Sequence, residues 1–149
     1  MEFTIPKALK SEHQELHAEL AKATKVAGKI GEAARAVAKI LHPHFVKEEE
    51  YALPPLGLLS HLAEGEVTPQ MGKVLQMTDR LKAEVRQMLE EHKAIVAALK
   101  NLSNVAKREK KIEYVHFADK LIAHAKTEEE VLYPIAILIG EYVKLKLGK

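Results

Sequence analysis

The stretch HFVKEEEYALP at residues 44–54 recurs as HAKTEEEVLYP at residues 124–134, with its histidine, three glutamates and proline in register. Each copy follows a single histidine at nearly the same distance. His13 lies 31 residues before the histidine of the first copy, and His92 lies 32 residues before that of the second. Residues four apart lie on one face of a helix, so each His-x-x-x-Glu pair directs an imidazole and a carboxylate toward one place. Two such places facing each other can hold two metal ions.

The composition predicts one globular, helical domain. A chain of 149 residues fits a single domain over residues 1–149, and a domain of this size buries about 70 % of its unfolded surface. Hydrophobic residues make up 47 % and charged residues 30 %, with only seven glycines and abundant Ala, Leu, Lys and Glu. The formal net charge is only +2 and the lysines are spread along the chain, so we expect no nucleic-acid partner.

Cysteine is absent, which excludes disulfides, iron–sulfur clusters and thiol chemistry. Histidine and carboxylate side chains are then the strong metal ligands that the chain can offer. Residues 1–7 lack a basic segment followed by an apolar one, and the apolar run at 131–140 is too short to span a bilayer. We therefore expect a cytosolic, cytoplasmic protein with no membrane partner.

Capping and turn signals divide the chain into four main helices. Prolines are tolerated in first helical turns, and glycines and polar stretches favour helix ends. The expected helices cover residues 6–28, about 31–51, 69–107 and 111–133. Pro134 should break the last helix before a short extra C-terminal helix. The apolar connection at 53–62 should pack over one end of the helices.

Each expected helix places one histidine inside its apolar stripe. His13 lies about 15 residues before the first turn and His44 about 13 after it, which is about 20 Å along each helix at 1.5 Å per residue. The second hairpin places His92 and His124 in the same way. The sequence therefore predicts an all-α, antiparallel, up-down-up-down four-helix bundle with both pairs at one level. Pro43 should introduce a kink or bulge directly before His44.

The first glutamate of each repeated stretch shares the inward face of its helix with the histidine. A buried carboxylate costs several kcal/mol unless a cation or hydrogen bonds compensate it. Four imidazoles and two carboxylates on inward faces therefore favour a metal site over a plain core. The candidate metal ligands are His13, His44, Glu48, His92, His124 and Glu128.

Two further side chains lie one helical turn from a candidate ligand. His17 follows His13 by four residues, and it either supplies a fifth nitrogen, supports a ligand from behind or lies at the surface. Tyr51 follows Glu48 by three residues. Its hydroxyl either hydrogen-bonds a group that bridges the metals or belongs to a core tyrosine.

The six candidate ligands resemble the ligand set of hemerythrin-like (HHE) domains, and the resemblance covers essentially the whole chain. Those domains are four-helix bundles that hold a non-haem diiron centre. The resemblance implies that His13 and His44 hold one iron and that His92 and His124 hold the other, with the two glutamates bridging them. Imidazole and carboxylate ligands suit iron, manganese or zinc. The resemblance places two non-haem iron ions ahead of manganese or zinc.

The chain departs from the oxygen-carrying hemerythrins on the third helix, where those proteins have a second histidine. The positions one turn before and after His92 are Met88 and Val96. Four histidines and two glutamates are instead similar to the ligands of hemerythrin-like proteins implicated in the repair of iron centres, although the extra N-terminal region of those proteins is absent here. The substitution argues against reversible oxygen carriage.

Three functional hypotheses follow. The leading one is a diiron protein that binds or senses a small oxidant (O2, NO or peroxide). The alternative is a diiron enzyme that reduces NO or peroxide, or that donates iron for the repair of iron centres under stress. The third is a metal-free bundle that binds a protein partner through its surface. The electron donor and any protein partner stay open.

Overall fold

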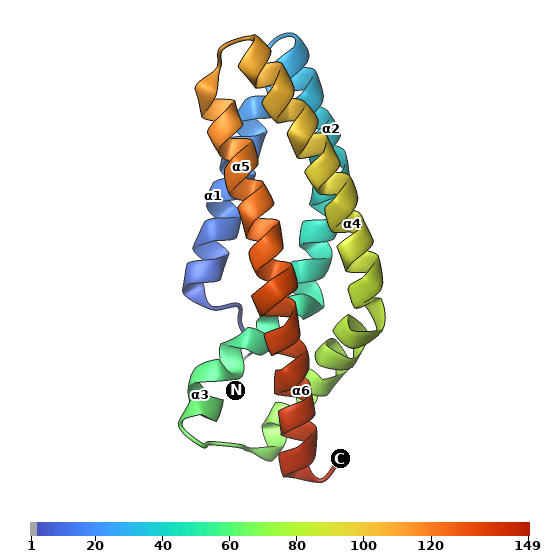
Figure 1. Ribbon diagram of the computed structural model, residues 1–149. Coiled ribbons are helices and arrows are strands. Elements are labelled where there is room, and N and C mark those ends of the chain that lie inside the picture. Colours follow the sequence, from blue (N-terminus) through green and yellow to red (C-terminus); the bar gives the residue numbers. More distant parts are fainter. Residues whose placement is uncertain (1–2) are drawn as a thin grey trace.

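The computed structural model describes residues 3–149, so the first two residues of the N-terminal segment considered above lie outside it. The described residues are mostly helical and form no strand. Figure 1 shows long helical rods packed side by side. The helices that build them are α1 (Lys7–Thr24), α2 (Lys29–Lys47), α4 (Leu75–Arg108), α5 (Ile112–Thr127) and α6 (Tyr133–Leu147).

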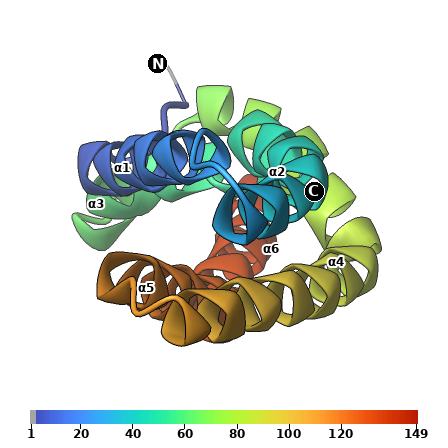
Figure 2. The ribbon, with the colours of Figure 1, turned by 90° about the horizontal axis from the view of Figure 1, so that it is seen from above.

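Successive rods run in opposite directions. In Figure 1, α1 and α2 are joined at the top of the view, as are α4 and α5, and α6 continues the line of α5 downward. Figure 2, the view from above, shows the α1/α2 hairpin on one side and the α4/α5 hairpin on the other. This helical bundle confirms the fold class predicted from the sequence.

The first hairpin turn begins earlier than expected. The helix predicted to end at residue 28 ends at Thr24, and α2 begins at Lys29. Gly28, directly before α2, has a φ of 84°, a conformation that glycine adopts without the steric cost of a side chain. The glycine therefore shapes the turn that leads into α2 and does not end α1.

The connection between the two hairpins is compact and apolar. It contains a 3-10 helix at Pro54–Leu58 and the short α3 (Leu59–Ala63), and a second 3-10 helix at Pro69–Val74 leads into α4. Leu56 and Leu58 are buried. Figure 1 shows this connection at the lower end of the molecule. The apolar segment thus packs over one end of the bundle, as its composition predicts.

Two apolar cores lie above and below the middle of the bundle. The upper core includes Leu16, Val37, Leu41, Leu99 and Leu121. The lower core includes Leu56, Met71, Leu81, Met88 and Ile139. Along α4 the chain passes from the lower core at Met88 to the upper core at Ile95, so His92 lies between them. The histidine level predicted from the sequence therefore separates the two cores.

The lower part of the bundle contains a close contact between α4 and α6. A Cβ atom built on Gly140 of α6 would lie 2.2 Å from Oγ1 of Thr78 on α4. Real Cβ atoms do not approach other atoms so closely, so only glycine allows the two helices this spacing. Within residues 3–149, no helix is both long enough and apolar enough to cross a membrane.

Each copy of the repeated stretch contains a π-helical turn. Glu48–Ala52 follows α2 directly, and Glu128–Leu132 follows α5 directly. The first glutamate therefore opens the π turn in both copies. Turns of this kind join residues five apart and are frequent at functional sites. They change which side chains face inward after the glutamate.

These π turns correct two expectations about the prolines. The helix α2 continues through Pro43, and the irregularity follows His44 instead of preceding it. Pro43 and Lys39, whose carbonyl loses its helical partner, are both exposed, so water can satisfy that carbonyl. The break expected at Pro134 is also absent, because the second π turn leads directly into α6. Pro134 lies in the first turn of α6, where a missing N–H is tolerated.

Candidate metal centre

A polar layer lies between the upper and lower cores. It consists of one histidine from each rod and the first glutamate of each π turn. These side chains are only 0 to 6 % exposed, and they are His13, His44, Glu48, His92, His124 and Glu128. The structure therefore brings together all six residues that the sequence proposes as metal ligands.

The six side chains form two groups of converging ligand atoms. The first group is His44, Glu48, His92 and Glu128, and the second is His13, His124 and Glu128. Within each group the atoms lie within 4.8 Å of one another. The Nε2 atoms of His44 and His92 are 2.9 Å apart, and the ring centroids of His13 and His124 are 5.1 Å apart.

This grouping differs from the pairing that the family resemblance implies. The expected pairs join histidines of the same hairpin, whereas the observed pairs join one histidine from each hairpin. Figure 2 shows the reason, because α2 lies opposite α4 and α1 lies opposite α5. Histidines at one level of the bundle therefore meet across the space between the hairpins.

Glu128 belongs to both groups. Its Oε1 lies 3.3 Å from His92 Nε2 in the first group. Its Oε2 lies 3.6 Å from His13 Nε2 and 3.3 Å from His124 Nε2 in the second. The two oxygens of one carboxylate thus face two different pairs of imidazoles. Glu48 lies in the first group, where its Oε1 is 3.4 Å from His44 Nε2.

Tyr133 also reaches the first group, which the sequence analysis did not anticipate. Its hydroxyl donates a hydrogen bond of 2.9 Å to Glu48 Oε2. The same oxygen lies 3.2 Å from His44 Nε2 and 3.1 Å from His92 Nε2. Burial raises the pKa of this phenol. The missed signal was its position five residues after Glu128, the spacing that a π turn joins.

Tyr51 does not contact the candidate ligands through its hydroxyl. The side chain is 2 % exposed, and its hydroxyl lies 3.7 Å from Met88 Sδ. Of the two alternatives for Tyr51, the structure therefore shows the core tyrosine. Met88, one turn before His92, belongs to the lower core.

Carboxylates contact the outward-facing nitrogens of the first pair of histidines. His44 Nδ1 lies 2.7 Å from Glu91 Oε1, and His92 Nδ1 lies 2.9 Å from Glu129 Oε1. Lys47 Nζ donates a further hydrogen bond of 2.5 Å to Glu91 Oε2. A carboxylate can only accept, so each Nδ1 carries the proton and each Nε2 presents its lone pair to the interior.

The second pair repeats this arrangement at one of its two histidines. His124 Nδ1 is hydrogen-bonded to Glu12 on α1. His13 Nδ1 lies 3.7 Å from Glu49 Oε1, beyond hydrogen-bond distance. Three of the four histidines thus have a glutamate hydrogen-bonded behind the ring, the arrangement that orients metal-binding imidazoles in proteins.

Burial is the main cause of the pKa shifts in the polar layer. It lowers the pKa of His44 to about 4, and it also lowers the pKa values of His92 and His124. Burial raises the pKa of Glu128 to about 7. His44, His92 and His124 are therefore neutral at pH 7, which is the form that binds metal.

Several buried atoms of this layer have no hydrogen-bond partner among residues 3–149. The unpartnered buried atoms include Nε2 of His13, Nε2 of His124, Oε1 of Glu48 and Oε2 of Glu128. Buried polar atoms in native proteins are nearly always partnered. Imidazole nitrogen and carboxylate oxygen are donors that divalent transition metals accept. The residues present therefore fit a metal site.

Comparison with protein families gives the same result. The family model described as Hemerythrin HHE cation binding domain matches residues 4–136, which is most of the chain. The chain belongs to the hemerythrin HHE cation-binding family. Comparisons with curated proteins and with solved structures gave no match. Family membership and the buried histidine–glutamate groups together indicate a metal-binding domain.

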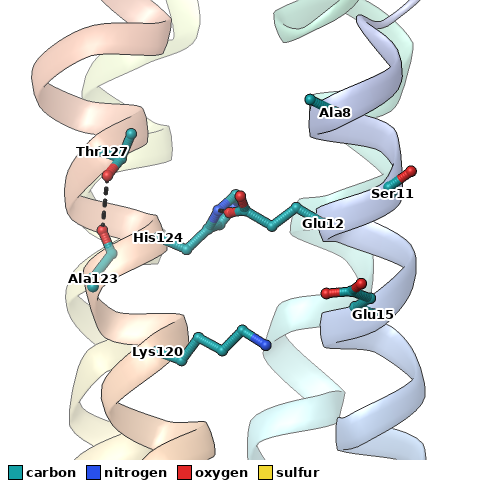
Figure 3. Close-up of a pocket in the computed structure, with 8 residues that line it drawn as sticks. All are labelled: Ala8, Ser11, Glu12, Glu15, Lys120, Ala123, His124 and Thr127. Carbon is teal, nitrogen blue, oxygen red and sulfur yellow. Dashed lines mark hydrogen bonds and ion pairs between the residues drawn. The ribbon is translucent and has the colours of Figure 1, made fainter.

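A surface groove of about 460 Å³ lies between α1 and α5 of this HHE domain, beside the second pair of histidines. Figure 3 shows Glu12 and His124 pointing toward each other across it. The small side chains Ala8, Ser11 and Ala123 also line the groove. The groove therefore brings solvent close to the layer on the His124 side, and a second groove of about 350 Å³ does the same beside His92 and Glu129.

His17 of the HHE domain lies apart from both ligand groups. The side chain is exposed, and its ring centroid lies 5.7 Å from that of His42 and 5.1 Å from that of Phe45. Its ring is tilted by 35° against that of Phe45, which in turn stacks on His13 at 4.5 Å. Of the three alternatives for His17, the structure therefore fits a surface residue. It reaches the candidate ligand His13 only through Phe45.

Proposed function

We propose that this HHE domain holds two non-haem iron ions and binds a small oxidant, O2, NO or peroxide, at them. The observation that carries the proposal is the placement of Glu128. Its two oxygens face two separate imidazole pairs, with distances of 3.3 Å to His92 and 3.3 Å to His124. A carboxylate placed in this way serves as a shared ligand for two ions better than as a partner of one.

Each ion would be held by one histidine pair. His44, His92 and Glu48 would hold the first ion, His13 and His124 the second, and Glu128 would contribute one oxygen to each. Iron bound there supplies reversible one-electron redox chemistry and open positions for a small ligand. Iron is preferred to manganese or zinc because of the family resemblance of the ligand set.

The protein itself orients the donors and limits water. Glu91, Glu129 and Glu12 hydrogen-bond the outward nitrogens of three histidines and hold the rings in place. The upper and lower cores exclude water above and below the polar layer. The candidate ligands are at most 6 % exposed, so a small molecule reaches them more readily than a large substrate. This burial favours a diatomic gas or peroxide as the ligand.

The proposal is tested by preparing the full chain anaerobically with iron(II). Elemental analysis should find about two irons per chain, and the optical spectrum should change when O2 or NO is added. A Glu128→Ala variant should bind less iron, while Glu130→Ala, an exposed neighbour, should bind as much as the original protein. Absence of bound iron from the original protein would refute the diiron proposal.

The same preparation separates a binding protein from an enzyme. One equivalent of NO or peroxide bound per centre, without further consumption under reducing conditions, would support a carrier or sensor. Repeated consumption that is lost in Glu48→Ala would instead assign the enzymatic alternative.

A further inference from the structure

Four potential donor atoms converge on one point in the first ligand group. Tyr133 Oη lies 2.9 Å from Glu48 Oε2, 3.2 Å from His44 Nε2 and 3.1 Å from His92 Nε2. The two Nε2 atoms are themselves 2.9 Å apart. Tyr133 is 1 % exposed, so water does not share these contacts from the outside.

Hydrogen bonding alone does not satisfy this arrangement. The Nδ1 atoms of His44 and His92 face carboxylates and carry the ring protons, so both Nε2 atoms offer lone pairs. Glu48 Oε2 is also an acceptor, and the phenol has only one proton to donate. One proton thus serves three acceptors within 3.2 Å of Tyr133 Oη. Lone pairs that face one another in a buried site are repulsive unless a cation lies among them.

The distances match those between ligands of one metal ion. Donors about 2.1 Å from an ion and at right angles to each other are about 3 Å apart. Four of the six distances among Tyr133 Oη, the two Nε2 atoms and Glu48 Oε2 lie between 2.9 and 3.2 Å. We infer that Tyr133 is a further protein ligand of the metal held by His44, His92 and Glu48. This inference rests on the proposed metal centre.

Coordination by Tyr133 increases the difference between the two metal positions, which already have four and three candidate ligands. The first position then has five protein ligands, the first group and Tyr133, whereas the second has His13, His124 and Glu128. The phenol oxygen donates an electron pair to the metal, and the phenol proton is released to solvent. The second position, beside the α1/α5 groove, has fewer protein ligands and is therefore the more open one. The small oxidant therefore binds on the His13/His124 side.

The inequality is encoded in the repeated stretch. Tyr133 lies nine residues after His124, and the equivalent position, nine residues after His44, is Leu53. Leu53 is buried in the lower core and offers no ligand atom. The two copies therefore share the histidine and the glutamate, but only the tyrosine of the second copy reaches the ligand group.

The test is spectroscopic and uses the full chain loaded with iron and oxidised with ferricyanide. A phenolate bound to ferric iron gives a visible charge-transfer band. Resonance Raman excitation in that band should show tyrosine ring modes that shift when the protein carries ring-deuterated tyrosine. Tyr133→Phe should lose the band and the ring modes while iron remains bound. Tyr51→Phe is the matched control, since Tyr51 is equally buried but contacts Met88, and it should keep both signals.

The possible failures are distinguishable. Iron-loaded original protein without the band, or Tyr133→Phe that retains it, would overturn ligation by Tyr133 and leave the diiron proposal standing. Loss of the band in Tyr51→Phe would show that the signal comes from Tyr51 and would also overturn the inference. If the original protein binds no metal at all, the metal centre and the ligation by Tyr133 are both refuted. Should Tyr133→Phe fail to fold, the isotope shift in the original protein and the Tyr51→Phe control still decide the question.

Discussion

Removal of one carboxylate behind a histidine should weaken metal binding without unfolding the protein. Glu129 Oε1 lies 2.9 Å from His92 Nδ1, and the glutamate side chain is 36 % exposed. Outer partners of this kind orient the ring and increase its basicity, and their loss typically weakens metal binding 10- to 100-fold. Glu129→Ala should therefore weaken iron binding by about 1.4 to 2.8 kcal/mol.

The change should appear mainly in the iron-loaded protein. At saturating iron, weaker iron binding reduces the stability of the folded protein by the same free energy. For a domain of this size the melting temperature should fall by about 3 to 10 °C. The metal-free melting temperature should change little, because Glu129 lies at the edge of the layer and surface substitutions usually alter stability by less than about 0.5 kcal/mol. The predicted result is a selective loss of stability in the iron-loaded form.

Iron(II) affinity can be measured anaerobically by competition with a coloured chelator, and melting by calorimetry with and without iron. Glu130→Ala is the matched control, since it removes the same charge from the next residue, which is 63 % exposed and pairs at 3.9 Å with Lys126. Equal iron affinities in the two variants would refute the orienting role of Glu129. An equal loss of melting temperature in the metal-free protein would show that Glu129 acts on the fold instead.

Three further predictions concern the metal-free protein. Burial raises the pKa of Glu128 from 4.5 to about 7, so its charge destabilises the fold above pH 7 and not below about pH 4.5. Glu128→Gln should therefore raise the free energy of unfolding by about 3 kcal/mol at pH 8 but not at pH 4.5. Urea titrations at both pH values measure this, and an equal increase in unfolding free energy at the two pH values would refute it. Leu99→Ala, in the upper core, should cost about 2 to 5 kcal/mol in a urea titration, whereas exposed Leu145→Ala should change stability by less than about 0.5 kcal/mol. Gly140→Ala should cost about 1 to 3 kcal/mol because its Cβ meets Thr78, and an unchanged melting curve would contradict the close α4/α6 contact.

The bundle and the contents of its polar layer could be predicted because both depend on position within single helices. Helical period places His44 and Glu48 on one face, and equal distance from the turns brings the histidines to one level. The duplication then repeats the argument for His124 and Glu128. These steps need no knowledge of how far each helix is rotated about its own axis.

The contacts between side chains of the polar layer could not be predicted in the same way. The pairing of His44 with His92 depends on how the two hairpins face each other, and spacing within one hairpin contains no information on this. The identity of the inward tyrosine depends on the π turn, because residues beyond such a turn face a different direction from those of a continuous α-helix. Helical period therefore favoured Tyr51, while the structure places Tyr133 beside the ligands.

The amino-acid sequence by itself determined the helical bundle, the six candidate ligands and their common level. It did so because hydrophobic period and residue spacing act along one chain segment at a time. Only the tertiary structure decided that Glu128 faces both histidine pairs and that Tyr133 contacts just one. Those contacts depend on the relative rotation and separation of helices, which packing of the two cores sets for the whole molecule at once.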